Sequence, residues 1–448
     1  MDVSMPTSLL SEPMKARHEP RAVSEAAWHS LLWLFVANFV GVGIAVLLLF
    51  PGLNALLGEW TYGRWIMVHM NLELYGWTSL PLVGFVFYVY RANHGASAKW
   101  CRPVLWIWSA ALGVGALSWL SGCSSGKLFL DWTGYARILF AIALLALWSL
   151  LIAAFIGNRD LSGSAGMANA AKVVGLIVLF AVPFAIYIAS SPNFYPAVNP
   201  DTGGPTGASQ LESSLMIVLV LLMIPFGVTQ RKPASARPVF LGWALLVAEA
   251  LLCVALGHAD TSNRSPAQFL SLGSLIVWIP LVPAYYAAFR WNGNTRRWRL
   301  AFLCWWGALV LTGWIFFLPG VLDHFKFTDG LVGHSFVAMA GFTSSLVIFL
   351  LIQLMGEDGW IFNRSRSFYG WHAGVIVYIL AVTLAGWREG DDPAFTIVPG
   401  AARKLLYTVR LISGIFMLLA SLDWFVDATV ALRQPAPAST NLVQEQKV

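Results

Sequence analysis

The segment from Phe327 to Phe342, FTDGLVGHSFVAMAGF, places a histidine at the start of a long apolar run. Thr328 and Asp329 precede the apolar periodicity and are residues that favour the N-terminus of a helix. His334 follows within two turns and is surrounded by small residues, which let a helix approach a bulky flat group. An imidazole at membrane depth is a candidate axial ligand of a heme iron. The alternative is a histidine that hydrogen-bonds to a neighbouring helix.

A second group of candidate residues lies in the segment TYGRWIMVHMNLELYGW, which contains His69 and Glu73. The two side chains are four residues apart and share one face of a helix. A glutamate at membrane depth is costly unless it is protonated or paired, so this face meets polar protein or a cofactor rather than lipid. His69 is therefore a second candidate heme ligand. Glu73 and, in a later apolar segment, Glu249 are candidate proton-relay groups, or else buried and protonated packing groups.

The elements that position these residues are expected to be membrane-spanning helices. The chain has 448 residues, of which 58% are hydrophobic and 11% charged, and its mean hydropathy is +0.68; soluble proteins average about 25% charged residues. Apolar runs recur that can each cross a hydrocarbon core, which predicts an all-α integral membrane protein with about twelve transmembrane helices. The predicted spans are 28–50, 64–90, 103–122, 134–156, 171–190, 211–230, 238–257, 268–290, 299–320, 331–355, 368–387 and 405–430. They form one domain, residues 28–430, between tails at 1–27 and 431–448.

The distribution of charge indicates the orientation of these spans. The formal net charge is +6, and most of the 28 lysines and arginines fall on one side if the N-terminus is cytoplasmic. This is the positive-inside bias of membrane proteins, so the charge reflects topology and does not imply a nucleic-acid partner. Residues 1–27 lack the apolar region of a signal peptide, and we expect a cytoplasmic tail of a multi-pass protein in a bacterial inner (plasma) membrane. The four cysteines have no spacing that supports a disulfide framework, an iron–sulfur site or covalent heme attachment.

The order of these segments resembles the catalytic subunit, subunit I, of the heme–copper oxidases, most closely that of the cbb-type cytochrome c oxidases. TYGRWIMVHMN resembles the family segment whose histidine ligates the low-spin heme, a role that would fall to His69. GHADTSNRSPAQFLSLG has the family's spacing from a copper-binding histidine pair to a downstream proline, and FTDGLVGHSFVAMAGF matches the tenth span. WHAGVIVYILAVTLAG and LYTVRLISGIFMLLASLDWF, which contains Arg410, resemble the last two spans.

The chain departs from the family at its metal ligands. In the family, the tenth span has two histidines separated by one residue, for the high-spin and the low-spin heme; here the positions hold His334 and Phe336. The family's copper ion needs three histidines, whereas the sixth span here has none and the pair at the end of the seventh reads His258-Ala259. The resemblance therefore implies one or two b-type hemes on His69 and His334. His258 would be a remnant of the copper site, and we expect no bound copper.

These features leave three hypotheses open. The first is an oxidase-subunit-I-like membrane protein of a respiratory electron-transfer complex, with b-type heme and a degenerate copper site, working with other membrane subunits such as a cytochrome c-type subunit. If the chain is an enzyme, this makes it a cytochrome c oxidase-type oxidoreductase; a nitric oxide reductase shares the fold but needs the same missing ligands. The second is a non-catalytic scaffold or assembly paralogue that docks through the polar loop 191–210. The third, a transporter or channel, lacks the repeated broken helices of that class.

Overall fold

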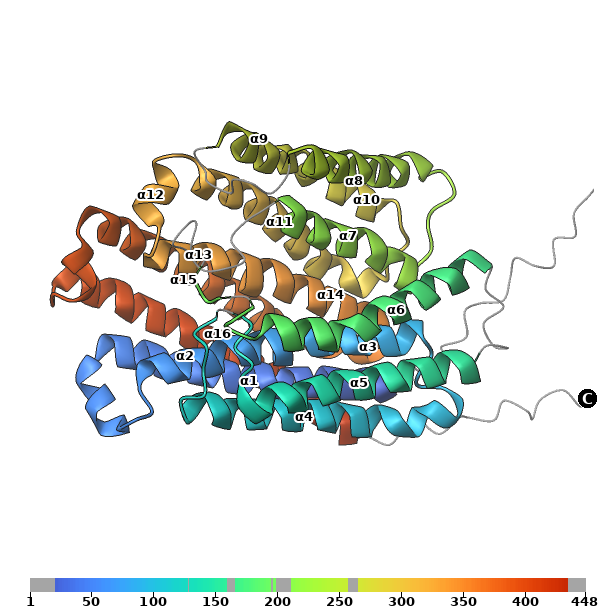
Figure 1. Cartoon of the computed structure of the whole chain (residues 1–448), viewed down its shortest axis with the longest axis horizontal. Helices are drawn as coiled ribbons and strands as arrows, with labels where there is room; N and C mark the ends of the chain where they lie inside the picture. The colour runs from blue at the N-terminus through green and yellow to red at the C-terminus, as the bar shows by residue number, and fades with distance from the viewer. Residues whose placement is uncertain are drawn as a thin grey trace, which may run out of the picture.

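The computed structural model describes residues 21–127, 129–158, 166–194, 196–198, 211–256 and 265–433. Within these ranges the regular secondary structure is helical and includes no strand, and Arg231 and Phe289 form an isolated β-bridge. Eleven helices in the described part of the chain are long and apolar enough to cross a membrane, and one further apolar helix is shorter. Figure 1 shows the helices side by side along the long axis of the molecule. The prediction of an all-α integral membrane protein is confirmed.

The α-helices, in chain order, are α1 (Arg21–Leu49), α2 (Tyr62–Asn71), α3 (Ser79–Val89), α4 (Ala98–Leu120), α5 (Gly134–Gly157), α6 (Gly166–Ala189), α7 (Leu211–Val228), α8 (Ala236–Leu256), α9 (Pro266–Ser274), α10 (Trp278–Ala287), α11 (Arg296–Phe317), α12 (Val321–Phe325), α13 (Asp329–Phe336), α14 (Ser344–Met355), α15 (Ser365–Asp391) and α16 (Ala401–Arg433). Two π-helices, η3 (Leu72–Thr78) and η8 (Val337–Thr343), join α2 to α3 and α13 to α14. α2, η3 and α3 together form one continuous span, and α13, η8 and α14 form another.

The first helix begins seven residues before its predicted start at residue 28. Val23, Ala26 and Ala27 are fully buried, and Gly84 of α3 lies directly against the first two. Packing of these small apolar side chains against another helix stabilises the first turns of α1. The polar composition of the tail did not predict a helix there. At the other terminus, α16 continues to Arg433. Residues 434–448 and most of the loop 191–210 lie outside the described residues, so the predictions for them remain predictions.

The centre of the bundle is the tenth predicted span. Every residue of α14 from Ser344 to Met355 is buried except Gln353, and more of this span is enclosed than of any other. The span begins with α13 at the position that the sequence indicates. The Thr328 hydroxyl caps this helix, because it accepts a hydrogen bond from the Gly330 backbone N–H at 3.1 Å. Gly330 in turn contacts Gly386 of α15 so closely that a side-chain carbon at residue 386 would lie 2.0 Å from the Gly330 nitrogen. α13 and α15 are therefore in backbone contact.

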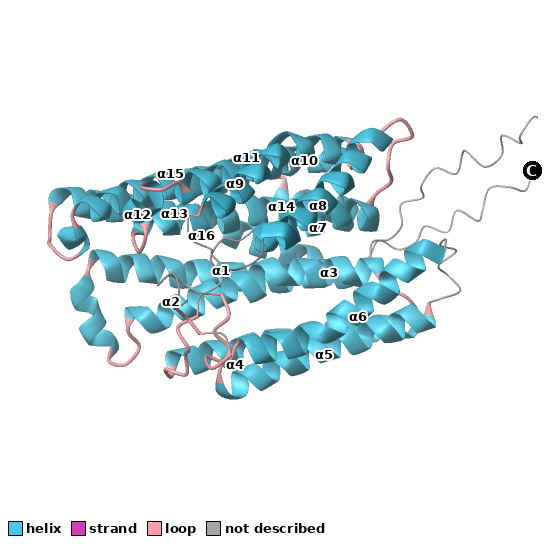
Figure 2. Cartoon of the chain, turned by 45° about the horizontal axis from the view of Figure 1, so that its top comes forward, coloured by secondary structure: helices cyan, strands magenta, loops and turns pink. Residues whose placement is uncertain are grey.

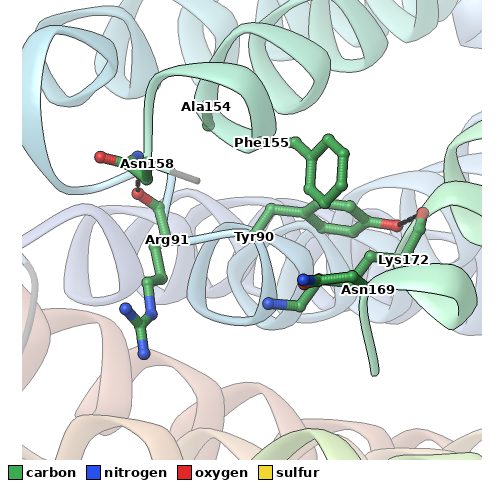
Figure 3. Close-up of a pocket in the computed structure, with 7 residues that line it drawn as sticks. All are labelled: Tyr90, Arg91, Ala154, Phe155, Asn158, Asn169 and Lys172. Carbon is green, nitrogen blue, oxygen red and sulfur yellow. Dashed lines mark hydrogen bonds between the residues drawn. The ribbon is translucent and has the colours of Figure 1, made fainter. Parts of the chain in front are cut away.

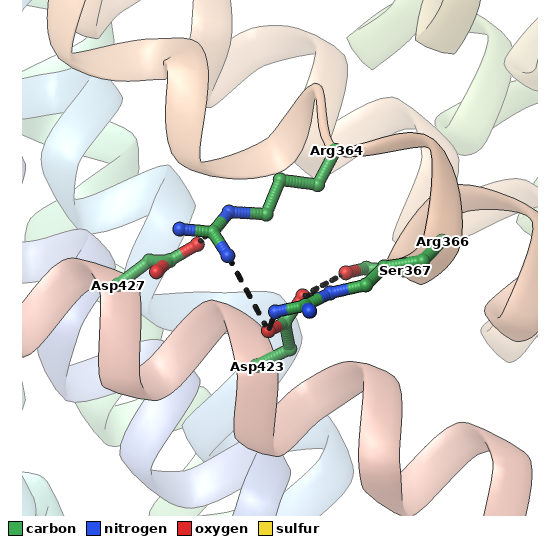
Figure 4. A network of polar contacts seen from close by, with 5 residues as sticks. All are labelled: Arg364, Arg366, Ser367, Asp423 and Asp427. Carbon is green, nitrogen blue, oxygen red and sulfur yellow. Dashed lines mark hydrogen bonds and ion pairs between the residues drawn. The ribbon is translucent and has the colours of Figure 1, made fainter.

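The two ends of the bundle differ in charge. Successive spans alternate in direction, so the end at which α1 begins also holds the ends of α3, α5 and α10 and the beginnings of α4, α6, α11 and α15 (Figure 2). We call it the basic end, because it carries Arg91, Lys99, Arg102, Lys172, Arg231, Lys232, Arg296, Arg297, Arg299, Arg364 and Arg366. Here Arg364 and Arg366 at the start of α15 pair with Asp427 and Asp423 of α16 (Figure 4).

Candidate functional site

His69 is held by the first helix. Its Nδ1 lies 2.8 Å from the carbonyl oxygen of Ala37 on α1. A carbonyl oxygen can only accept, so Nδ1 carries the proton and Nε2 keeps its lone pair. A side-chain carbon at Gly41, one turn along α1, would lie 2.9 Å from Cε1 of the ring. The sequence places a glycine where only a hydrogen atom leaves room for the imidazole.

His334 is held in the same manner by a different helix. Its Nδ1 lies 3.1 Å from the hydroxyl oxygen of Thr312 on α11. That hydroxyl donates its own proton to the carbonyl oxygen of Ala308 at 2.7 Å, one turn back along α11. The threonine oxygen therefore accepts from the imidazole, which again leaves the lone pair on Nε2. Hydrogen bonding of one imidazole nitrogen to fix the other is the usual arrangement around a metal-bound histidine.

Both imidazoles combine a deep position in the bundle with partial accessibility. Neither Nε2 atom of His69 and His334 has a hydrogen-bond partner among the described residues. An imidazole whose Nδ1 is held by a hydrogen bond and whose Nε2 lone pair is unpaired is suited to bind a metal ion. The donor chemistry therefore fits a heme iron.

The two histidine helices share a local construction. Gly76-Trp77-Thr78-Ser79 follows His69, Gly341-Phe342-Thr343-Ser344 follows His334, and both glycines come seven residues after their histidine. In both stretches the first three residues end the π-helix that begins three residues after the histidine, and the serine begins the next α-helix. In each, the threonine and serine hydroxyls donate to carbonyl oxygens four or five residues back, which stabilises the loosened backbone. π-Helical turns are often found at functional sites.

The two stretches touch each other. The indole N–H of Trp77 donates to the Ser344 hydroxyl at 2.8 Å, and the contact is buried. α2–α3 and α13–α14 run in the same direction (Figure 1). At about 1.5 Å per residue, His69 and His334 lie about 12 and 15 Å along their helices from this contact, both toward the end opposite the basic end. The structure thus brings the two candidate ligands to similar depth, although against different neighbouring helices.

Phe336, two residues after His334, points to another face of the bundle. Its ring stacks on Tyr378 of α15, with centroids 3.9 Å apart. The guanidinium of Arg410 lies 5.3 Å from the centroid of the Tyr378 ring and pairs with Asp329 at 3.2 Å. His334 faces α11 whereas Phe336 faces α15, as expected for two positions on opposite sides of a helix. Phe336 has no lone pair and cannot bind a metal ion. This face of α13 therefore packs against Tyr378 and holds no heme ligand.

A cleft of about 490 Å³ opens at the end opposite the basic end, above the histidines. It is lined by Leu47, Leu48, Pro51, Asn54, Tyr62, Phe327, Thr328, Asp329, Val332, Glu389, Thr396, Arg403 and Tyr407. Tyr62 lies seven residues, about 10 Å, before His69 on the same helix. Oε1 of Glu389 and Nε of Arg403 are buried and have no hydrogen-bond partner among the described residues. The cleft therefore offers charged groups to a ligand that reaches the histidines.

The two candidate proton-relay groups lie in different surroundings. Glu73, in η3, is deep in the bundle but partly accessible, and no described residue contacts its carboxyl group by a hydrogen bond or an ion pair. Glu249 on α8 is 4% exposed and accepts a 2.6 Å hydrogen bond from the indole of Trp278, while its second oxygen is buried without a described partner. No described contact joins the two carboxyl groups to each other.

Comparison with known proteins shows which proteins this chain is similar to. No family model matches the chain. It is 24% identical to cytochrome c oxidase subunit 1 of Rhodobacter capsulatus, in an alignment that covers 96% of this chain and 88% of the relative. It is 20% identical to a cytochrome c oxidase subunit 1 homolog of Agrobacterium tumefaciens (strain T37), over 90% of this chain and 82% of the relative. The chain is similar to cytochrome c oxidase subunit I proteins over most of its length. This confirms the resemblance inferred from the segments above.

A copper centre of the heme–copper oxidase type finds no support in the described residues. Among them, no three or more histidine, cysteine, aspartate or glutamate side chains are grouped closely enough to hold a metal ion. His258, the predicted remnant of the copper site, lies outside the described residues. α7, which corresponds to the sixth predicted span, contains no histidine.

Three residues that position the histidines of this oxidase-like chain were not found from the sequence. Ala37 acts through its backbone carbonyl, and Gly41 through the lack of a side chain, so neither residue type indicates the role. Thr312 is an ordinary residue in an apolar run, and its contact with His334 depends on how α11 packs. The glycine–aromatic–threonine–serine stretch seven residues after each histidine was a usable signal, although no repeat of fixed period extends over the chain.

Proposed function

We propose that this protein is an oxidase-subunit-I-like component of a respiratory electron-transfer complex and binds b-type heme through Nε2 of His69 and of His334. The observation that carries the proposal is the shared geometry of the two imidazoles. Each gives its Nδ1 proton to a neighbouring helix and leaves its Nε2 lone pair without a partner among the described residues. A bound heme would supply one-electron transfer.

Two hemes, one for each histidine, fit this arrangement better than one heme shared by both. His69 is oriented by α1 and His334 by α11, and each is followed by its own π-helix. The cleft above them contains Arg403, and Arg410 lies beside it at Asp329. Guanidinium groups at this place suit the carboxylates of a heme. Phe336 leaves the His69 heme without a histidine from α13, and copper is not expected.

The two candidate glutamates take different roles in this proposal. Glu73 lies on the His69 face of its helix without a described partner, so it is the better candidate to exchange protons near that heme. Glu249 is held by Trp278 and is the better candidate for a buried packing group. The basic end faces the cytoplasm in a bacterial inner membrane. Electrons would arrive at the opposite end from another membrane subunit, such as a cytochrome c-type subunit.

The test is a reduced-minus-oxidised absorption spectrum of the detergent-purified protein, with heme quantified as the pyridine hemochrome. We expect a b-type spectrum and close to two hemes per chain, with H69A and H334A each losing one heme. H324A is the matched control, because His324 bonds the Trp387 carbonyl oxygen at 3.0 Å outside the proposed sites. If wild type holds one heme and both variants lose it, a single shared heme replaces the two-heme proposal. A colourless wild-type protein refutes heme binding and leaves the scaffold hypothesis.

A further inference from the structure

A small pocket lies at the basic end, between the last residues of α3 and α5 and the beginning of α6 (Figure 3). Its lining residues are Tyr90, Arg91, Ala154, Phe155, Asn158, Asn169 and Lys172. The volume of about 10 Å³ admits one group of about the size of a water molecule. Two of the seven lining residues are cationic and none is acidic. The pocket is far along the chain, and along the bundle, from the histidine sites.

Side-chain contacts hold the three helix ends in place. The Tyr90 hydroxyl donates to the Lys172 carbonyl oxygen at 2.8 Å, which joins α3 to α6. The Asn158 amide donates to the Arg91 carbonyl oxygen at 3.0 Å, which joins α5 to α3. A side-chain carbon at Gly175 would lie 2.6 Å from the Tyr90 hydroxyl, so α6 lies as close as a glycine permits. The pocket is therefore a formed feature of the fold and not a gap between loose ends.

Two side chains of the pocket, those of Lys172 and Asn169, have polar atoms without partners in the described part of the chain. Lys172 is partly buried, and no described residue accepts a hydrogen bond from its ammonium group or pairs with it. The side-chain oxygen of Asn169 is buried and also without a partner. Because an amide can turn to present either oxygen or nitrogen, Asn169 can donate to a ligand beside the lysine. An ammonium group without a partner among the described residues, next to an amide that can present its NH₂ group, suits an oxygen of an anion.

The surface next to the pocket is apolar. Val173, Val174 and Ile177 on α6 are 42%, 59% and 66% exposed, and Ile156 on α5 is 67% exposed. In a membrane protein such a surface faces acyl chains. We propose that the pocket binds one phosphate oxygen of an anionic phospholipid, with Lys172 as the charged contact and the acyl chains along α6. Basic pockets between transmembrane helices at the positively charged side of a membrane protein suit such headgroups.

The experiment uses the full-length protein in detergent after delipidation and measures the thermal midpoint against added lipid. The additives are phosphatidylglycerol, zwitterionic phosphatidylcholine and inorganic phosphate. We expect phosphatidylglycerol alone to raise the midpoint, and K172Q to need at least tenfold more of it for the same rise. K99Q is the matched control, since Lys99 is an exposed lysine at the same end outside the pocket and its change removes the same charge. Y90F removes the hydrogen bond between α3 and α6 without altering charge, and we expect it to weaken the response as well.

Three results would overturn the proposal. One is an unchanged phosphatidylglycerol response in K172Q. Another is an equal response to phosphatidylcholine, which would show a general lipid effect. The third is inorganic phosphate reproducing the full rise, which would make this a site for a free anion. If K172Q does not fold, K172R must keep the wild-type response and Y90F must weaken it, or the proposal fails. None of the lining residues contacts His69 or His334, so the result is independent of whether heme is bound.

Discussion

The indole of Trp77 donates a hydrogen bond to the hydroxyl of Ser344, across 267 positions of sequence and in the interior of the bundle. The two residues belong to the matching stretches that follow His69 and His334, so this contact fixes the relative depth of the two histidines. Ser344, the first residue of α14, also donates to the Met339 carbonyl oxygen of the preceding π-helix at 2.9 Å. One hydroxyl thus serves the π-helix and the contact between the two spans.

Removing this hydroxyl is expected to destabilise the protein. In S344A the buried N–H of Trp77 loses its acceptor, and an unsatisfied buried donor costs about 1–3 kcal/mol. The thermal midpoint of the purified protein should fall clearly below that of wild type. S149A is the control, because the exposed Ser149 hydroxyl bonds only a carbonyl oxygen of its own helix. Equal midpoints for the two variants would show that the Trp77 contact has no role in stability.

A methyl group at Gly41 is expected to reduce heme binding without removing a proposed ligand. The new carbon would lie 2.9 Å from the His69 ring, which must then turn away from the Ala37 carbonyl oxygen. We expect G41A to lose a large fraction of the heme held by His69, measured as heme per chain. Gly43 has nothing within 4 Å of the equivalent position, so G43A should match wild type. Full heme occupancy in G41A would count against His69 as a ligand.

The contact between Gly386 and Gly330 predicts a severe effect on folding. An alanine at residue 386 places its side-chain carbon 2.0 Å from a backbone nitrogen, which cannot move aside as a flexible side chain can. Overpacking a tight interface costs about 1–3 kcal/mol and sometimes more, and here we expect the upper end or beyond. The yield of folded protein, measured by size-exclusion chromatography, should drop sharply for G386A. G370A on the same helix, where no atom is near, should behave as wild type.

The ion pairs at the basic end predict unequal effects of two arginine changes. Arg364 lies 2.7 Å from Asp427, whose side chain is 8% exposed, whereas Arg366 is 69% exposed and bonds Asp423 (Figure 4). R364A leaves a largely buried carboxylate without its partner, at about 1–3 kcal/mol. R366A removes an exposed pair worth about 0–1 kcal/mol. Thermal midpoints should therefore fall further for R364A, and the reverse order would contradict this reading of burial.

The sequence by itself determined the membrane character, the approximate limits of most spans, and the resemblance to cytochrome c oxidase subunit I. These follow from hydrophobic length and from residue order, which need no knowledge of packing. It also identified His69 and His334, because an ionisable side chain in an apolar run stands out. The early start of α1 at Arg21 was missed, since burial of Val23 and Ala26 against α3 depends on a distant part of the chain.

The tertiary structure decided which nitrogen of each histidine is available and which helix holds the ring. Those facts depend on a backbone carbonyl at Ala37 and on the hydroxyl of Thr312, which is already committed to its own helix. It also set the two histidines at similar depth through Trp77 and Ser344. Hydrogen bonds between helices arise only when spans remote in sequence pack together. Local composition therefore names the groups capable of chemistry, and packing alone orients them.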